Sequence, residues 1–70
     1  KVMAFRVNLN GRTFHVNTIE EGVAAIESAL RAYCPSGVYV RSAGRVTRLY
    51  SVNFDGSAGH QLPADIYHLN

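Results

Sequence analysis

The sequence predicts a small α+β domain in which one amphipathic helix packs on one face of an antiparallel sheet. Three observations support this prediction: a hairpin signal at residues 10–11, a segment of helical periodicity at residues 18–33, and strand-like alternation on both sides of that segment. The expected order is β-β-α-β-β, with a possible short fifth strand toward the C-terminal end. The 70 residues are expected to form a single domain, residues 1–70.

The first hairpin is the clearest local signal. Residues 3–9 alternate apolar and polar side chains, and Asn10-Gly11 then supplies the pair of residues that favours a two-residue hairpin turn. Such a turn makes residues 12–17 the return strand and places Val7 opposite Phe14. Apolar side chains therefore meet on one face of the pair, as a well-defined register requires.

Residues 18–33 predict the helix. Thr18 and Glu21 have the spacing of a capping box, in which each side chain accepts a hydrogen bond from a backbone N–H group that the first turn leaves unpaired. Pro35 and Gly37 favour an end to the helix just before them. Apolar side chains recur at spacings of four and three along the segment: Ile19, Val23, Ile26, Leu30 and Tyr33. This stripe predicts a helix that covers one side of a sheet.

A second hairpin is expected from residues 38–41 and 45–54, joined by a three-residue loop at 42–44 with Gly44 in the left-handed region. This register sets Val40 opposite Val46, and a two-residue loop at Ala43-Gly44 would mix the faces more. The expected apolar face is Val38, Val40, Val46, Tyr50, Val52 and Phe54. Arg48 falls on that face too, so it either extends its charged end to the sheet margin or marks a bulge.

The last part of the chain gives weaker signals. Residues 55–61 have the composition of a loop, and Leu62-Pro63 interrupts any strand pattern. Residues 66–69 are expected to form a short edge strand or to lie across the sheet without joining it.

Composition limits the possible functions. The longest apolar runs are far too short to cross a bilayer, and the N-terminal residues lack the apolar region of a signal peptide. The single cysteine, Cys34, is expected to be a small buried residue, which favours a cytoplasmic location. The three histidines are scattered, so neither a metal nor another cofactor is expected. No pair of nucleophile and base is evident, and we expect a protein that is not an enzyme.

A helix on one side of the sheet leaves the other side in water. We expect that side to display Arg6, Asn8, His15, Tyr39, Arg41, Arg45, Thr47 and Leu49. In this register Arg41 and Arg45 are neighbours across the second hairpin and repel each other unless an anion or an acidic partner lies between them. Three of the five acidic residues lie in the helical segment, so the sheet face is expected to be basic and the helix face acidic.

The leading hypothesis is a protein-binding module that docks this basic face, or a strand edge, on an acidic protein surface. The residues expected to bind the partner are Arg6, His15, Tyr39, Arg41 and Arg45. In size and architecture the chain resembles the very small α+β proteins of phages and mobile elements, several of which block a larger host complex. This resemblance implies an inhibitor.

Three alternatives remain open. Nucleic acid could bind the same face, but Tyr39 is the one aromatic residue expected there and no RNP-type motif is present. The chain could instead be a structural subunit that dimerises through sheet faces or edges, which would help so small a core. Finally, the arginines could simply keep an exposed sheet soluble.

Overall fold

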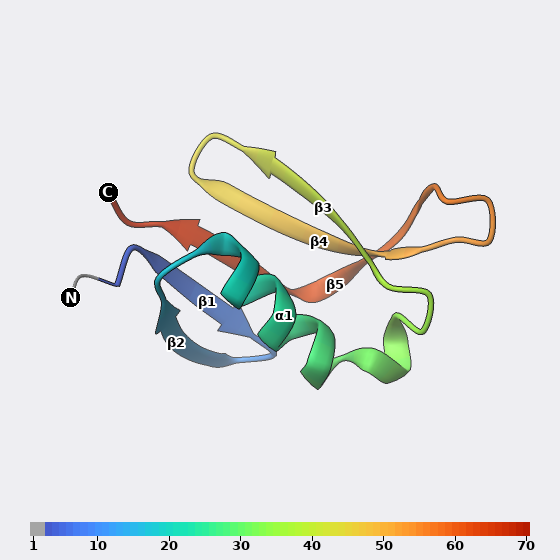
Figure 1. Cartoon of the computed structure of the whole chain (residues 1–70), viewed down its shortest axis with the longest axis horizontal. Coiled ribbons are helices and arrows are strands. Elements are labelled where there is room, and N and C mark those ends of the chain that lie inside the picture. Colours follow the sequence, from blue (N-terminus) through green and yellow to red (C-terminus); the bar gives the residue numbers. More distant parts are fainter. Residues whose placement is uncertain (1–2) are drawn as a thin grey trace.

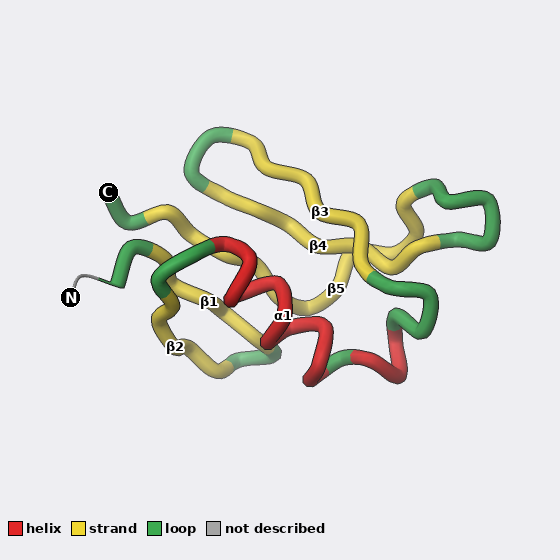
Figure 2. The backbone as a smooth tube through the Cα atoms, in the orientation of Figure 1, coloured by secondary structure: helices red, strands yellow, loops and turns green. Residues whose placement is uncertain are grey.

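The computed structural model describes residues 3–70, which form a five-stranded antiparallel sheet and one α-helix (Figure 1). The elements are β1 (Phe5–Leu9), β2 (Arg12–Val16), α1 (Ile19–Ala29), a 3₁₀ turn (Arg31–Tyr33), β3 (Val38–Ala43), β4 (Val46–Val52) and β5 (Ala58–His68). The helix packs on one face of the sheet, chiefly against β1, β2 and β5 (Figure 2). The predicted fold class, including a fifth strand, is confirmed.

The first hairpin has the predicted register. Val7 lies opposite Phe14, and the turn residues Asn10 and Gly11 have positive φ angles of 49° and 87°. Asparagine and glycine tolerate this left-handed conformation, which matches the twist of the flanking strands. The local sequence therefore determines this hairpin.

The predicted helix start is also confirmed. The Glu21 N–H donates to Thr18 Oγ1 at 3.1 Å, and the Thr18 N–H donates to Glu21 Oε1 at 3.0 Å. The α-helix ends earlier than expected, at Ala29, and a 3₁₀ turn follows. That change in winding rotates Tyr33 out of the apolar stripe, and its side chain is 70% exposed. The prediction that Tyr33 faces the sheet is wrong.

The register of the second hairpin differs from the prediction. The turn has two residues, Gly44 and Arg45, and Val40 pairs with Leu49 rather than with Val46. A shift by an odd number of residues moves every side chain of β4 to the other face of the sheet. The shift places Leu49 in the core with no exposed surface. It also brings the hydroxyl oxygens of Ser42 and Thr47 to 2.7 Å, so the hydroxyl of the buried threonine is paired.

The expectations for the C-terminal part were largely wrong. The sheet order is β2-β1-β5-β4-β3, so β5 is the central strand and not an edge (Figure 1). It begins at Ala58, inside the expected loop, and continues through Pro63 to His68. The two hairpins β1–β2 and β3–β4 pair with opposite sides of β5, which joins them into one sheet.

Pro63 is accommodated by an irregularity between β4 and β5. The register changes between the pairs Arg48–Asp65 and Tyr50–Gln61, so residues 62–64 of β5 lie against one residue of β4. Proline has no N–H group for a sheet ladder, and a bulge is one of the few places where a strand tolerates it. The carbonyl oxygen of Pro63 remains paired and accepts a hydrogen bond from the Asn10 N–H at 2.8 Å.

The core lies between α1 and the sheet. Eight apolar residues are buried there: Val7, Ile26, Leu30, Cys34, Leu49, Leu62, Ala64 and Ile66. The Cys34 thiol donates to the carbonyl oxygen of Leu30 at 3.1 Å, and burial raises the pKa of this thiol. The prediction that Cys34 is a small buried residue is confirmed.

Candidate functional site

The sheet face opposite α1 is the candidate site, and we call it the open face. Buried Val7, Leu49 and Ile66 mark the core side of their strands, so their neighbours in sequence and the cross-strand partners of those neighbours point the other way. The open face includes Arg6, Asn8, Thr13, His15, Tyr39, Arg41, Val46, Arg48, Tyr50, Gln61, Asp65 and Tyr67.

The structure brings four of the five expected binding residues together on this face: Arg6, His15, Tyr39 and Arg41. Arg45 instead lies in the β3–β4 turn, and its Nη1 is 3.4 Å from the carbonyl oxygen of His68. The partner of Arg41 across the hairpin is therefore Arg48, not Arg45.

The prediction that Thr47 and Leu49 lie on the open face is wrong. Thr47 and Leu49 are 4% and 0% exposed, and they belong to the core side of β4. The residues that take their place are Arg48 and Tyr50, which the predicted register had turned toward the helix. The misfit of Arg48 in the sequence pattern was thus a sign of the wrong register.

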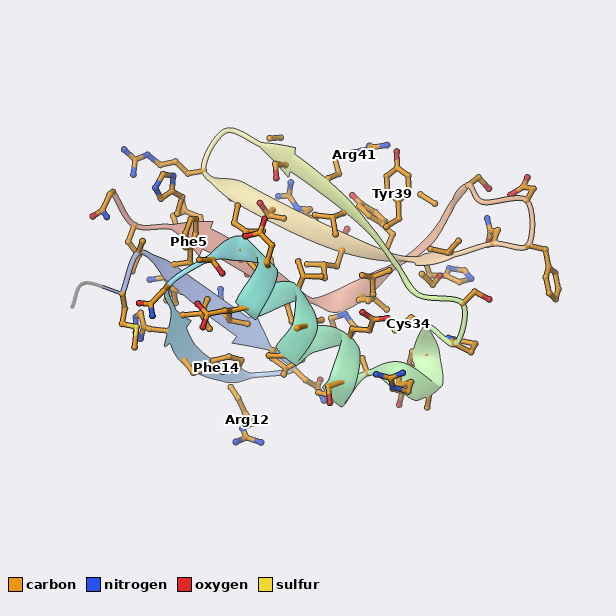
Figure 3. All side chains as sticks on the ribbon, viewed as in Figure 1. Phe5, Arg12, Phe14, Cys34, Tyr39 and Arg41 are labelled. Atoms are coloured by element: carbon orange, nitrogen blue, oxygen red, sulfur yellow. The ribbon has the colours of Figure 1, made fainter. Side chains whose placement is uncertain are left out.

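One end of the open face is an aromatic cluster on β3 and β4. The rings of Tyr39 and Tyr50 meet edge to face with their centroids 6.4 Å apart. The guanidinium carbon of Arg41 lies 5.7 Å from the centroid of the Tyr50 ring, within the range of a cation–π interaction. In Figure 3, Tyr39 and Arg41 project from β3 on the side away from α1. The tyrosine ring therefore holds the arginine where a ligand can reach it.

A second pair of the same kind lies on β1 and β5. The guanidinium carbon of Arg6 is 5.1 Å from the centroid of the Tyr67 ring, and Tyr67 is 37% exposed. His15 is the partner of Arg6 on β2 and extends the cluster to that edge of the sheet. Both arginines thus lie over tyrosine rings on neighbouring strands.

A row of polar side chains runs between the two clusters. Arg41, Arg48 and Asp65 are successive cross-strand partners on β3, β4 and β5. Asn8 Nδ2 donates to Asp65 Oδ1 at 2.7 Å, and Thr13 Oγ1 donates to Asn8 Oδ1 at 3.3 Å. One carboxylate oxygen is thereby held toward β1, while two arginines adjoin one another on the other side.

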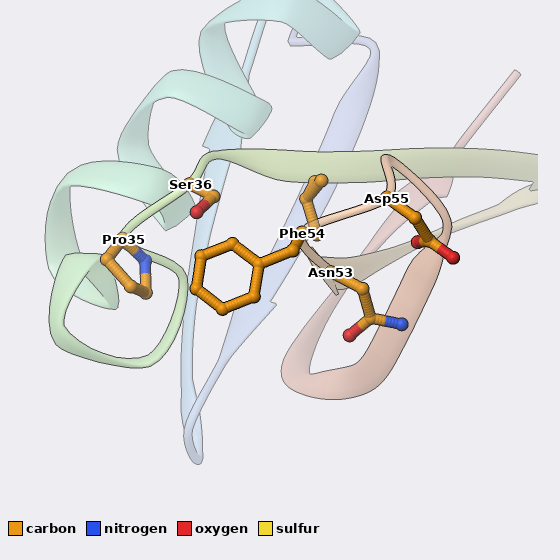
Figure 4. A pocket seen from close by; sticks show the side chains of 6 residues that line it. Pro35, Ser36, Asn53, Phe54 and Asp55 are labelled. Carbon is orange, nitrogen blue, oxygen red and sulfur yellow. The ribbon is translucent and has the colours of Figure 1, made fainter.

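A pocket of about 560 Å³ lies elsewhere, between the segment after the 3₁₀ turn and the β4–β5 connection (Figure 4). Its lining is Pro35, Ser36, Val52, Asn53, Phe54 and Asp55. The ring of Phe54 is fully exposed, and hydrogen bonds from Ser57 lower the pKa of Asp55. Asp55 is the one ionisable side chain of this lining, so the pocket offers no acid–base pair.

A second pocket of about 420 Å³ includes Tyr33, Ser51 and His60. The Ser51 hydroxyl accepts a hydrogen bond from the backbone N–H of His60 at 2.9 Å, so its recorded contact is with the main chain and not with the imidazole. Nothing here has the nucleophile–base geometry of an activated serine. Within residues 3–70, no three histidine, cysteine or acidic side chains come close enough to hold a metal ion. None of the helices in that range is both long and apolar enough to span a membrane.

The arginine and tyrosines of the open face that the sequence did not place there are Arg48, Tyr50 and Tyr67. Asp65 and Tyr67 are two residues apart, as side chains on one face of a strand are. Pro63 concealed this signal, because a proline argues against a central strand. Comparison with known proteins adds no assignment: no protein-family model, no curated protein and no solved structure matches this chain.

Proposed function

We propose that the open face binds single-stranded nucleic acid, with its arginines contacting phosphate groups and its tyrosines stacking on bases. The observation that supports this best is the interleaving of three tyrosines with three arginines on one uncovered face: Tyr39, Tyr50 and Tyr67 with Arg6, Arg41 and Arg48. The sequence suggested a single aromatic residue there, which had favoured protein over nucleic acid. In this proposal the protein acts by binding alone.

The spacing of the two arginine–tyrosine clusters suits such a ligand. Neighbouring strands are about 4.8 Å apart, so β1 and β3, the outer strands of the two clusters, are separated by roughly 14 Å across the sheet. Sheet platforms of this width stack two or three unpaired bases. Arginine guanidinium planes can stack on bases in the same way as aromatic rings. Each cluster therefore provides one stacking surface together with one positive charge.

The pair Arg41–Arg48 adds a site for a phosphate. Like charges on directly opposed residues of neighbouring strands destabilise a sheet, and a bound anion removes that cost. Asp65 follows next in the row, but the hydrogen bond from Asn8 holds one of its oxygens toward β1. We therefore expect the positive potential of this face to be strongest over β3 and β4.

The proposal is tested by fluorescence anisotropy with labelled single-stranded RNA and DNA of about 12 nucleotides, a length within the range bound by comparable single-strand modules. If Arg6, Arg41 and Arg48 each neutralise one phosphate, affinity falls about 20-fold between about 50 mM and 200 mM salt. Arg41→Gln/Arg48→Gln reduces that fall to about three-fold, because one phosphate contact remains.

The matched control is Arg12→Gln/Arg31→Gln, which removes the same charge from β2 and the 3₁₀ turn. Arg12 is exposed and points out from β2 in Figure 3, and Arg31 is exposed outside the sheet. This control should keep the salt dependence of the wild type. Absence of binding at the lower salt concentration, or an equal effect of both double variants, contradicts the proposal.

A second candidate is the one favoured by the sequence: docking on an acidic protein surface, in the manner of a small inhibitor. Arginine and tyrosine, of which the open face carries three each, are enriched in protein interfaces. Poly-L-glutamate distinguishes the two candidates because it offers negative charge without bases. Tyr39→Leu should weaken oligonucleotide binding about five-fold or more through lost stacking and leave polyglutamate binding unchanged. Polyglutamate that binds as tightly as the oligonucleotide supports the protein candidate.

A further inference from the structure

A groove on the other side of the molecule, between α1 and β3, has no role in the proposed nucleic-acid site. Its volume is about 370 Å³, and it is lined by Ile19, Glu20, Val23, Ala24, Glu27 and Val40. We call it the α1–β3 groove. The helix and β3 follow the same diagonal in Figure 1, and Val40 is the residue of β3 that lines the groove.

The strand that contributes Val40 to this groove is at the edge of the sheet. Within residues 3–70, β3 pairs with β4 alone and is the outermost strand, so one side of its backbone has no strand partner there. Its six residues pair regularly, with no bulge, and contain neither proline nor lysine. Proteins commonly use bulges, prolines or charged side chains to prevent further pairing at such an edge. β3 has neither a bulge nor a proline, and its one charged side chain, Arg41, lies on the open face.

The floor of the groove is apolar and accessible. Val40 is 41% exposed on the core side of β3, although its cross-strand partner Leu49 is fully buried. Val23 and Ile19 on the helix are only partly buried. The main contacts of α1 are with β1, β2 and β5, so the helix leaves the side chain of Val40 partly exposed. An apolar side chain placed here would remove exposed surface from all three residues.

The rim of the groove is acidic. Glu20 and Glu27 both line it and are seven residues apart on the helix, which corresponds to about 10.5 Å along the axis. In an extended peptide, side chains on one face recur about every 6.8 Å, so residues i and i+4 are about 13.6 Å apart. The flexible side chains of lysine or arginine can bridge the difference of about 3 Å.

We infer that the α1–β3 groove binds an extended basic peptide, which adds to β3 as a sixth strand of the sheet. The peptide places an apolar side chain at i+2 against Val40 and Val23, and lysine or arginine at i and i+4 next to Glu20 and Glu27. Main-chain hydrogen bonds to the β3 edge provide affinity, and the alternating side chains provide specificity. The charge of the rim selects a basic partner and disfavours an acidic one.

The test selects peptides of about seven residues, the length of an ordinary strand, from a random displayed library on the purified full chain. The expected peptides share the sequence pattern basic–x–apolar–x–basic. In an NMR titration, one of these peptides should shift the amide resonances of β3 and α1. Enrichment of acidic or patternless peptides, enrichment of none, or shifts centred on β1 and β5 would each overturn the inference. Because the open face is not involved, failure of nucleic-acid binding leaves this result unaffected.

Three comparisons sharpen the test. Glu20→Gln and Glu27→Gln should each weaken the selected peptide about two- to five-fold, whereas Asp55→Asn, a matched change in the remote β4–β5 connection, leaves affinity unchanged. Two N-methylated forms of the peptide are compared, one methylated at its odd-numbered residues and one at its even-numbered residues. Only alternate N–H groups of an added strand face β3, so one form should lose binding and the other should keep it. If both methylated peptides bind, the peptide does not add to β3 as a strand. If light scattering shows a dimer that Val40→Arg dissociates, the occupant of the edge is a second copy and the inference is wrong.

Discussion

Replacement of Gly22 by alanine tests a close approach between α1 and the sheet. Gly22 is buried in α1, and a methyl group added to it would lie 2.8 Å from Ile66 Cδ1 and 3.2 Å from Val7 Cγ2. The free energy of unfolding gains about 1 kcal/mol from the better helix propensity of alanine. Overpacking against two fully buried side chains costs about 1–3 kcal/mol. Taking the middle of that range, we expect Gly22→Ala to lower the free energy of unfolding by about 1 kcal/mol.

Thermal and urea unfolding followed by circular dichroism measure this effect. For a domain of this size, about 1 kcal/mol corresponds to a decrease of about 4–8 °C in Tm. Ala24→Gly provides the reference for propensity, because Ala24 is exposed on the same helix. Its expected loss of about 1 kcal/mol has no packing component.

The double variant Gly22→Ala/Ile66→Val separates packing from propensity. Ile66→Val removes the Cδ1 atom that is nearest to the new methyl group, and alone it costs about 0.5–1.5 kcal/mol. In the double variant the new methyl group occupies the vacated space, so the two losses should be less than additive by at least about 0.5 kcal/mol. A stabilised Gly22→Ala, or strictly additive losses, would refute the close packing of α1 on β5.

Three further predictions follow from contacts described above. Leu49→Ala should lower the free energy of unfolding by about 2–5 kcal/mol in urea titration because Leu49 is fully buried, whereas a Leu49 on the open face would cost less than about 1 kcal/mol. Thr18→Ala should cost about 1 kcal/mol in the same assay through loss of the capping box, and no loss would contradict the cap. Ser57→Ala should raise the pKa of Asp55 in carboxyl-carbon NMR, since hydrogen bonds from Ser57 now lower it. The lowered pKa means that this turn is stabilised at pH values above about 3.9 and loses that contribution as the pH falls through the folded-state pKa of Asp55.

The elements predicted correctly are those determined by neighbouring residues. Asn10-Gly11 fixes the first turn because both residues accept positive φ, and Thr18 with Glu21 fixes the helix start through hydrogen bonds within three residues. Such interactions are present whether or not the rest of the sheet has formed. The open face on β1 and β2 follows from them, which is why Arg6 and His15 were placed correctly.

The second hairpin and β5 depend on distant residues. Gly44, with φ of 62°, suits a two-residue turn as well as the three-residue loop that was expected, so the turn sequence alone does not set the register. Burial of Leu49 and pairing of β4 with β5 decide it. β5 itself contains Pro63 and is a strand because it has partners on both sides. The tyrosines at positions 50 and 67 could not be assigned to the open face without these contacts.

The central position of β5 also has a consequence for folding. The two hairpins can form from neighbouring residues as soon as each has left the ribosome, but neither has a strand on its inner edge until residues 58–68 arrive. Isolated two-stranded hairpins are marginal in water. The cooperative step therefore waits for the last strand of the sheet, and pairing of β5 requires contacts across most of the described chain. Folding of this small protein should be slower than its size suggests, with native stability acquired only when β5 joins both hairpins.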